Sequence, residues 1–112
     1  MCTHSGTSVT HPGGDPCATT CSGCQWTLTQ ITSKKVGTDC EFSYRVSRTG
    51  CDNQTNQTFS GTTVVPCNQS TTVNFYCDPQ GTCVGYVLTL TGCPCPDPPG
   101  GGASPQTPER LT

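Results

Sequence analysis

The sequence predicts an all-β fold, a small disulfide-rich β-sandwich or pair of packed hairpins within a single domain. Two observations support this prediction. Cysteine accounts for 11 of the 112 residues, a density typical of domains held together by disulfides. The hydrophobic residues between the cysteines recur with a period of two, which is the period of β-strands rather than of helices.

The hydrophobic core that this chain can build is thin. Without the cysteines, hydrophobic residues make up about a fifth of the sequence, near the level at which burial alone no longer secures folding. A native disulfide typically contributes about 2–4 kcal/mol, so five of them would rival the net stability of an average domain. We therefore expect cross-links, more than the core, to stabilise the fold.

The chain divides into three parts by composition. Residues 1–16 contain Pro and Gly without a hydrophobic period, which predicts a flexible or assembly arm. Residues 17–95 hold ten of the eleven cysteines and are expected to form the β-domain. Residues 96–112 contain five prolines and three consecutive glycines, a composition typical of an extended tail or linker.

Alternation of side chains indicates where the strands lie. Phe42, Tyr44 and Val46 share one face of an extended segment, and a similar alternation runs through 84–91. Ile31 breaks the phase of its own segment and predicts a β-bulge there. The sequence Asp78-Pro79-Gln80-Gly81 suits a type I turn. The expected strands are two hairpins, 24–35 with 40–48 and 71–77 with 83–92, and a further strand at 58–65.

The cysteines imply an oxidising compartment, and we expect the protein to be extracellular or at the cell surface. Eleven cysteines cannot all pair within one chain. Cys2 lies fifteen residues from its nearest neighbour, so we expect it to be the intermolecular thiol, or alternatively the lipidated start of a surface lipoprotein. The other ten are expected to form disulfides: Cys17, Cys21, Cys24, Cys40, Cys51, Cys67, Cys77, Cys83, Cys93 and Cys95.

The cluster Cys17-x3-Cys21-x2-Cys24 has two alternative interpretations. With a fourth thiolate it could hold tetrahedral zinc, and Cys21-Ser22-Gly23-Cys24 could be a thiol–disulfide exchange motif. Redox motifs of that kind begin a helix, whereas the residues that follow Cys24 alternate as a strand does. Disulfides to distant strands are the preferred interpretation, and no metal or other cofactor is expected.

Nothing in the sequence marks a catalytic centre. Acid–base or nucleophilic catalysis requires a histidine or a pair of carboxylates in a rigid setting. The two histidines, His4 and His11, lie in the predicted arm, and Asp39 and Glu41 have the character of a solvated turn. We therefore expect the protein not to be an enzyme.

Charge and hydropathy bear on the partners. The net charge of −2 disfavours nucleic-acid binding, which requires a basic surface, and no apolar run is long enough to span a membrane. Candidate glycosylation sites are Asn53, Asn56 and Asn68, each followed by x-Ser/Thr.

Two functional hypotheses remain. The first is a structural subunit of an extracellular assembly (a fibre, coat or matrix) that forms a homo-oligomer or filament by self-association, through edge strands or through the terminal segments. The alternative is a monomeric secreted adhesive or inhibitor-like binding module, whose partner is an extracellular glycan or another surface protein. Its candidate binding patch is the basic group of the first hairpin, Lys34, Lys35, Arg45 and Arg48.

Overall fold

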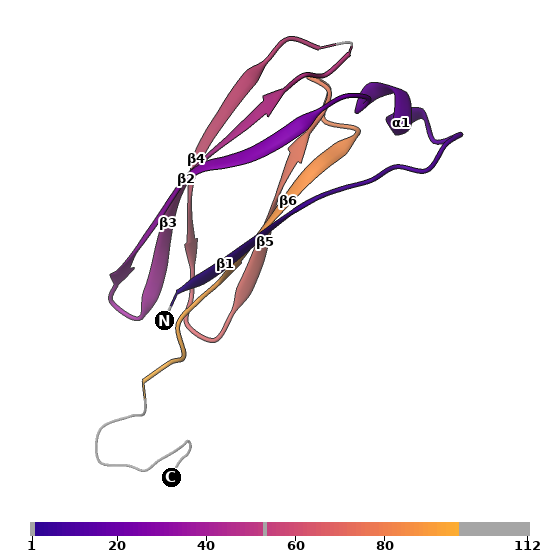
Figure 1. Cartoon of the computed structure of the whole chain (residues 1–112). Coiled ribbons are helices and arrows are strands. Elements are labelled where there is room, and N and C mark those ends of the chain that lie inside the picture. Colours follow the sequence, from indigo (N-terminus) through magenta and orange to yellow (C-terminus); the bar gives the residue numbers. More distant parts are fainter. Residues whose placement is uncertain (1, 53, 97–112) are drawn as a thin grey trace.

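A computed structural model describes residues 2–52 and 54–96, which form a two-layered β-structure with one short helix (Figure 1). The predicted all-β, disulfide-rich fold is confirmed. The elements are β1 (Thr3–Ser8), α1 (Pro16–Thr20), β2 (Gln25–Val36), β3 (Asp39–Thr49), β4 (Gln57–Val65), β5 (Ser70–Tyr76) and β6 (Val84–Thr91).

The strands form two antiparallel sheets of three strands each. β3 is the central strand of one sheet, in the order β2-β3-β4, and β6 is central in the other, in the order β1-β6-β5. Both predicted hairpins are present, β2 with β3 and β5 with β6, and β4 lies at the position expected for the additional strand. The predicted turn is also present, since the backbone N–H of Gly81 donates to the carbonyl oxygen of Asp78 over 3.2 Å.

The core lies between the inner faces of the two sheets. Alternate residues of the central strands are buried, because successive side chains of a strand point to opposite faces. The aromatic rings meet at this interface, where Trp26 of β2 stacks on Phe59 of β4 and on Tyr86 of β6 at about 6 Å between ring centroids. The largest fully buried side chains come from both layers: Phe42, Val46 and Val65 from one sheet, and Leu88 and Leu90 from the other.

The phase break in β2 is a bulge, as predicted. The pairing of β2 with β3 shifts between Leu28 and Gln30, so that Leu28 opposite Val46 and Ile31 opposite Tyr44 both face the core. The hydroxyl of Thr29, the extra residue, donates to the carbonyl oxygen of Arg45 over 3.1 Å. The bulge therefore keeps a twelve-residue strand in register with one hydrophobic face.

Part of the segment 1–16, which was predicted to be a flexible or assembly arm, belongs to the β-structure. Residues Thr3–Ser8 form β1, which pairs with β6 over its whole length. All six residues of β1 are exposed, so the strand has no hydrophobic alternation from which it could have been predicted. The predicted tail, 96–112, falls outside the described residues from 97 onward.

The helix α1 was also not expected. The side chain of Asp15 accepts a 2.9 Å hydrogen bond from the N–H of Cys17, and Pro16 occupies the first helical position. An Asp-Pro pair of this kind is a sequence signal for the start of a helix. The helix is only five residues long, and its C-terminal Cys21 bonds back to the carbonyl oxygen of Cys17 over 2.9 Å.

Five disulfides cross-link the domain, and their arrangement corrects two of the expectations about cysteines. Cys2 is bonded to Cys40 within the chain rather than free, and Cys93, expected to be paired, is the free cysteine. The distance of Cys2 from the other cysteines in the sequence did not predict its pairing, because β1 brings Cys2 back against β3. The disulfides are Cys2–Cys40, Cys17–Cys83, Cys21–Cys77, Cys24–Cys51 and Cys67–Cys95.

The same pairing bears on the cluster of Cys17, Cys21 and Cys24. Each of the three is bonded to a partner far along the chain, so none of them is a free thiolate for zinc. Cys21 and Cys24 are not bonded to each other, as an exchange motif would require. The preferred interpretation, disulfides to distant segments, is confirmed. Across the described residues, no helix has the length and apolar character needed to cross a membrane.

Candidate functional site: an open strand edge and a hydroxyl face

The structure does not bring the four predicted basic residues into one surface patch. Arg48 is only 2% exposed, because it continues the inward phase of Phe42, Tyr44 and Val46 along β3. The same alternation in the sequence could have revealed this position. Of the remaining three, Lys34 forms a 3.3 Å ion pair with Glu41, and Lys35 is exposed.

Arg48 instead has a structural role between the layers. Its guanidinium donates to the carbonyl oxygens of Cys77 at 2.8 Å and of Thr55 at 2.7 Å, and it lies 5.7 Å from the centroid of the Phe59 ring. A buried arginine needs such acceptors, since an unpaired buried charge is costly. This residue is therefore removed from the candidate binding patch.

The outer face of the β2-β3-β4 sheet is covered by hydroxyl groups, and we call it the hydroxyl face. Hydrogen bonds cross from β3 to β4 between Ser43 and Thr62 and between Ser47 and Thr58, each over 3.4 Å. Such pairs between opposing strands stabilise a sheet on its solvated side. The face consists of Thr27, Thr32, Ser43, Ser47, Thr58, Ser60 and Thr62.

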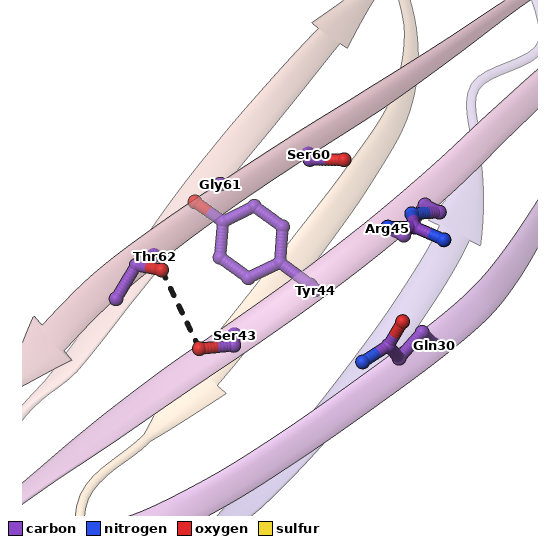
Figure 2. A pocket seen from close by; sticks show the side chains of 7 residues that line it. All are labelled: Gln30, Ser43, Tyr44, Arg45, Ser60, Gly61 and Thr62. Carbon is purple, nitrogen blue, oxygen red and sulfur yellow. Dashed lines mark hydrogen bonds between the residues drawn. The ribbon is translucent and has the colours of Figure 1, made fainter.

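A hollow of about 320 Å³ lies on this face. Figure 2 shows the Ser43–Thr62 hydrogen bond within it, with Gln30 from β2 and Arg45 from β3 nearby. Below them, the ring of Tyr44 packs against Gly61, where a Cβ atom would come within 2.8 Å of the ring. The hollow offers hydroxyls, an amide and a guanidinium, groups that bind hydroxylated or anionic ligands.

The second feature is the open edge of β1. The backbone N–H of Val9 donates a 2.9 Å hydrogen bond to the carbonyl oxygen of Gly85. Val9 and Gly85 are therefore a hydrogen-bonded pair that continues the register between β1 and β6. Hydrogen-bonded and non-bonded pairs alternate along an antiparallel ladder, so the residues at even positions direct their backbone groups away from β6. These residues are His4, Gly6 and Ser8, and among the described residues no strand pairs with that side of β1.

The side chains of β1 do not protect this edge. Natural proteins usually guard exposed edges with lysine, proline or a bulge. The sequence of β1, Thr-His-Ser-Gly-Thr-Ser, contains neither lysine nor proline, and its register with β6 is continuous. By contrast, the edge strand β2 carries Lys34 and Lys35. The β1 edge, like that of β4 (Gln57–Val65), thus carries neither lysine, proline nor a bulge against pairing with another strand.

Two of the three candidate glycosylation sites lie in the segments between strands. Asn56 and Asn68 are exposed, and their side-chain carbonyl oxygens accept hydrogen bonds from the N–H groups of Gly50 at 3.1 Å and Cys95 at 3.2 Å. Asn68 also has a positive φ of 62°. Asn53 lies outside the described residues. Whether these side chains carry glycans stays a prediction.

The two histidines are placed differently from each other. His4 is exposed on β1, whereas the His11 ring contacts the carbonyl oxygen of Val84 at 2.7 Å and the Asp15 carboxylate at 3.4 Å. Cys17 lies close to this pair, but its sulfur is already bonded to Cys83. The His11 contacts hold the segment between β1 and α1 against the start of β6.

Comparison with known proteins gives no relative for this chain: no family model, no curated protein and no solved structure matches it. The function of this chain is therefore inferred from its geometry.

Proposed function

We propose that this chain is a non-enzymatic structural subunit of an extracellular assembly, and that copies associate through the open edge of β1. The observation that carries the proposal is the six-residue strand Thr3–Ser8, which is exposed throughout and paired on one side only. Unpaired backbone groups along such an edge are a template for a strand of another molecule.

The simplest arrangement is antiparallel pairing of β1 with β1 of a second copy. Such a contact is self-complementary, as a two-fold dimer interface must be. If Gly6 lies at its centre, His4 of one copy lies opposite Ser8 of the other. Repulsion between copies is small, because the net charge is only −2.

The extracellular location rests on the five disulfides, since such bonds persist in oxidising surroundings. They also suit a structural role. A domain that stands outside the cell, without a large core, gains from bonds that restrict its unfolded state. The disulfides support an extracellular location independently of the β1 edge.

The decisive experiment measures sedimentation of the wild-type chain over a wide range of concentration. We expect oligomers that dissociate on dilution. The double substitution His4→Lys with Ser8→Lys places like charges opposite each other in the proposed contact, and it is expected to give monomers. A matched control, Gln69→Lys with Gln80→Lys, adds the same charge at exposed turns and should associate as the wild type does.

Two results would oppose the proposal. A wild-type chain that is monomeric at every concentration would remove self-association as its function. Association that survives the lysine pair unchanged would show that another surface makes the contact. Circular dichroism of each variant establishes that the sheets remain intact.

The hollow on the hydroxyl face favours the alternative function, a monomeric binding module for an extracellular glycan. Arg45 and Gln30 at this hollow could bind the carboxylate and hydroxyl groups of an acidic sugar. Under this alternative, Arg45→Glu abolishes binding to acidic glycans, whereas Lys35→Glu, which reverses a charge away from the hollow, leaves binding intact.

A further inference from the structure

Three sulfur atoms gather where the two sheets meet at one end of the domain. The thiol sulfur of Cys93 lies 3.1 Å from Sγ of Cys2 and 3.1 Å from Sγ of Cys40, and the latter two are bonded to each other. Cys93 is 4% exposed and Cys40 is completely buried. The free thiol is thus packed directly against a disulfide, a placement that ordinary core packing does not require.

The three cysteines come from three different parts of the fold. Cys40 belongs to β3 in one sheet, Cys93 follows β6 in the other, and Cys2 precedes the edge strand β1. A bond between Cys40 and Cys93 would therefore cross-link the two sheets as the observed Cys2–Cys40 bond does. Replacement of one bond by the other preserves the link between the layers and releases Cys2.

Cys93 and Cys40 are held beside each other by the backbone. The N–H of Cys93 donates to Sγ of Cys40 over 3.3 Å, and the carbonyl oxygen of Cys93 accepts from the N–H of Asn68 over 2.9 Å. Nearby, the Cys67–Cys95 disulfide anchors the segment that follows β6. Cys40 and Cys93 thus lie on fixed segments, whereas Cys2 is attached at the end of an exposed strand.

We propose that this cluster is a thiol–disulfide exchange site that converts Cys2 into a reactive thiol. The thiolate of Cys93 attacks Sγ of Cys40, a bond forms between these two sulfurs, and the Cys2–Cys40 bond breaks. The electron pair leaves on Sγ of Cys2, which takes up a proton in place of the one lost by Cys93. The numbers of disulfides and thiols do not change, so no oxidant is needed.

Burial decides which sulfur leaves. Exchange could in principle release either Cys2 or Cys40, but Cys40 is inaccessible to water and Cys2 is partly exposed. A thiolate is more stable where water can solvate it. Because Cys93 is equally distant from both sulfurs, it lies beside the bond, and side-chain rotation must bring it into line before it attacks.

The released Cys2 is suited to react with an external disulfide. It lies beside the exposed β1 strand, where a small dialkyl disulfide can approach. The Cys2 thiolate attacks one sulfur of that molecule, forms a mixed disulfide, and displaces the other half as a thiolate. This modification site does not depend on the self-association proposed above.

The test uses oxidised glutathione as the probe on the native chain, followed by acid quenching and mass spectrometry of unreduced peptides. We expect glutathione on Cys2 together with a Cys40–Cys93 disulfide. In Cys93→Ser, which lacks the attacking thiol, we expect modification of Cys2 to fall at least tenfold. Glutathione attached to Cys93, or no adduct on the native wild type, would overturn the proposal.

A second variant tests the alternative bond directly. Cys2→Ser leaves Cys40 and Cys93 as the remaining pair in the cluster, and we expect them to form a disulfide in a folded chain with no thiol that reacts with an alkylating agent. Two alkylated cysteines in this variant, after unfolding without reduction, would show that the fold does not accept the exchanged bond and would refute the inference.

Discussion

The guanidinium of Arg48 on β3 donates a 2.8 Å hydrogen bond to the carbonyl oxygen of Cys77, directly after β5 in the opposite sheet. The same group reaches the carbonyl oxygen of Thr55 at 2.7 Å, and within the described part of the chain its Nε has no hydrogen-bond partner. A single buried cation therefore joins the two layers at the end of the domain opposite to the sulfur cluster.

Replacement of Arg48 by lysine is expected to destabilise the protein by about 2–4 kcal/mol. Lysine has one ammonium group and cannot reproduce the fork that serves both carbonyl oxygens, so the buried hydrogen bond to Cys77 or the part-buried one to Thr55 would be lost. Chemical denaturation measures the loss. The control is Arg45→Lys on the exposed face, where the expected change is below about 0.5 kcal/mol. Equal stability of both variants would contradict the role given to Arg48.

Substitution of Gly6 by alanine is expected to detach β1 from β6. A Cβ at Gly6 would overlap the hydroxyl oxygen of Tyr86, whose side chain is buried. Overpacking of this kind costs about 1–3 kcal/mol. Hydrogen exchange should become faster at Thr3, Ser5 and Thr7, whose N–H groups point toward β6.

Gly13→Ala is the matched control for that substitution. It lies in the same N-terminal segment, and no atom of the described residues is within 4 Å of a Cβ built there. Its exchange rates should equal those of the wild type. Undisturbed exchange in Gly6→Ala would mean that Tyr86 moves aside without cost.

Stability should fall in acid because of Asp78. Hydrogen bonds to its carboxylate lower the pKa of Asp78 below its ordinary value, first from the hydroxyl of Thr82 and then from the N–H groups of Cys83 and Thr82, although burial opposes them. A pKa that is lower in the folded chain adds stability above the unfolded pKa, and this stability is lost as the pH falls through the folded pKa.

The measurement is denaturation of wild type and Asp78→Asn from pH 7 down to strong acid. The variant is expected to be less stable at neutral pH, and the difference should narrow as the pH falls below the carboxyl range. Asp39→Asn, at the first residue of β3, serves as the control and should behave as the wild type does. A constant difference between wild type and Asp78→Asn across the pH range would rule out this linkage.

The disulfide Cys17–Cys83 should contribute more stability than Cys24–Cys51. The first closes 66 residues and the second 27, and the chain-entropy relation gives about 4.4 and about 3.6 kcal/mol. The first also fastens α1 to the start of β6. Both cysteines of each disulfide are replaced by serine, and the loss of stability is compared by thermal unfolding. A larger loss on removal of Cys24–Cys51 than of Cys17–Cys83 would contradict the prediction.

The predicted parts of the fold are those that depend on local alternation. The strand that contains Phe42, Tyr44 and Val46 was identifiable, as was the strand at 84–91. A strand with one buried face must place hydrophobic residues at every second position. The same rule would have placed Arg48 in the core. The open edge of β1 could not be predicted, since a strand exposed on every residue leaves no pattern in its sequence.

The sequence by itself determined an all-β domain rich in disulfides, with its two hairpins, its bulge and its turn, because each of these follows from residues close together in the chain. Only the tertiary structure decided that Cys2 bonds to Cys40, that Cys93 stays free beside them, and that Arg48 meets Cys77 across the layers. Those contacts join residues that are 29 to 91 positions apart. Composition and spacing leave many such pairings open, and the packing of the two sheets selects one of them.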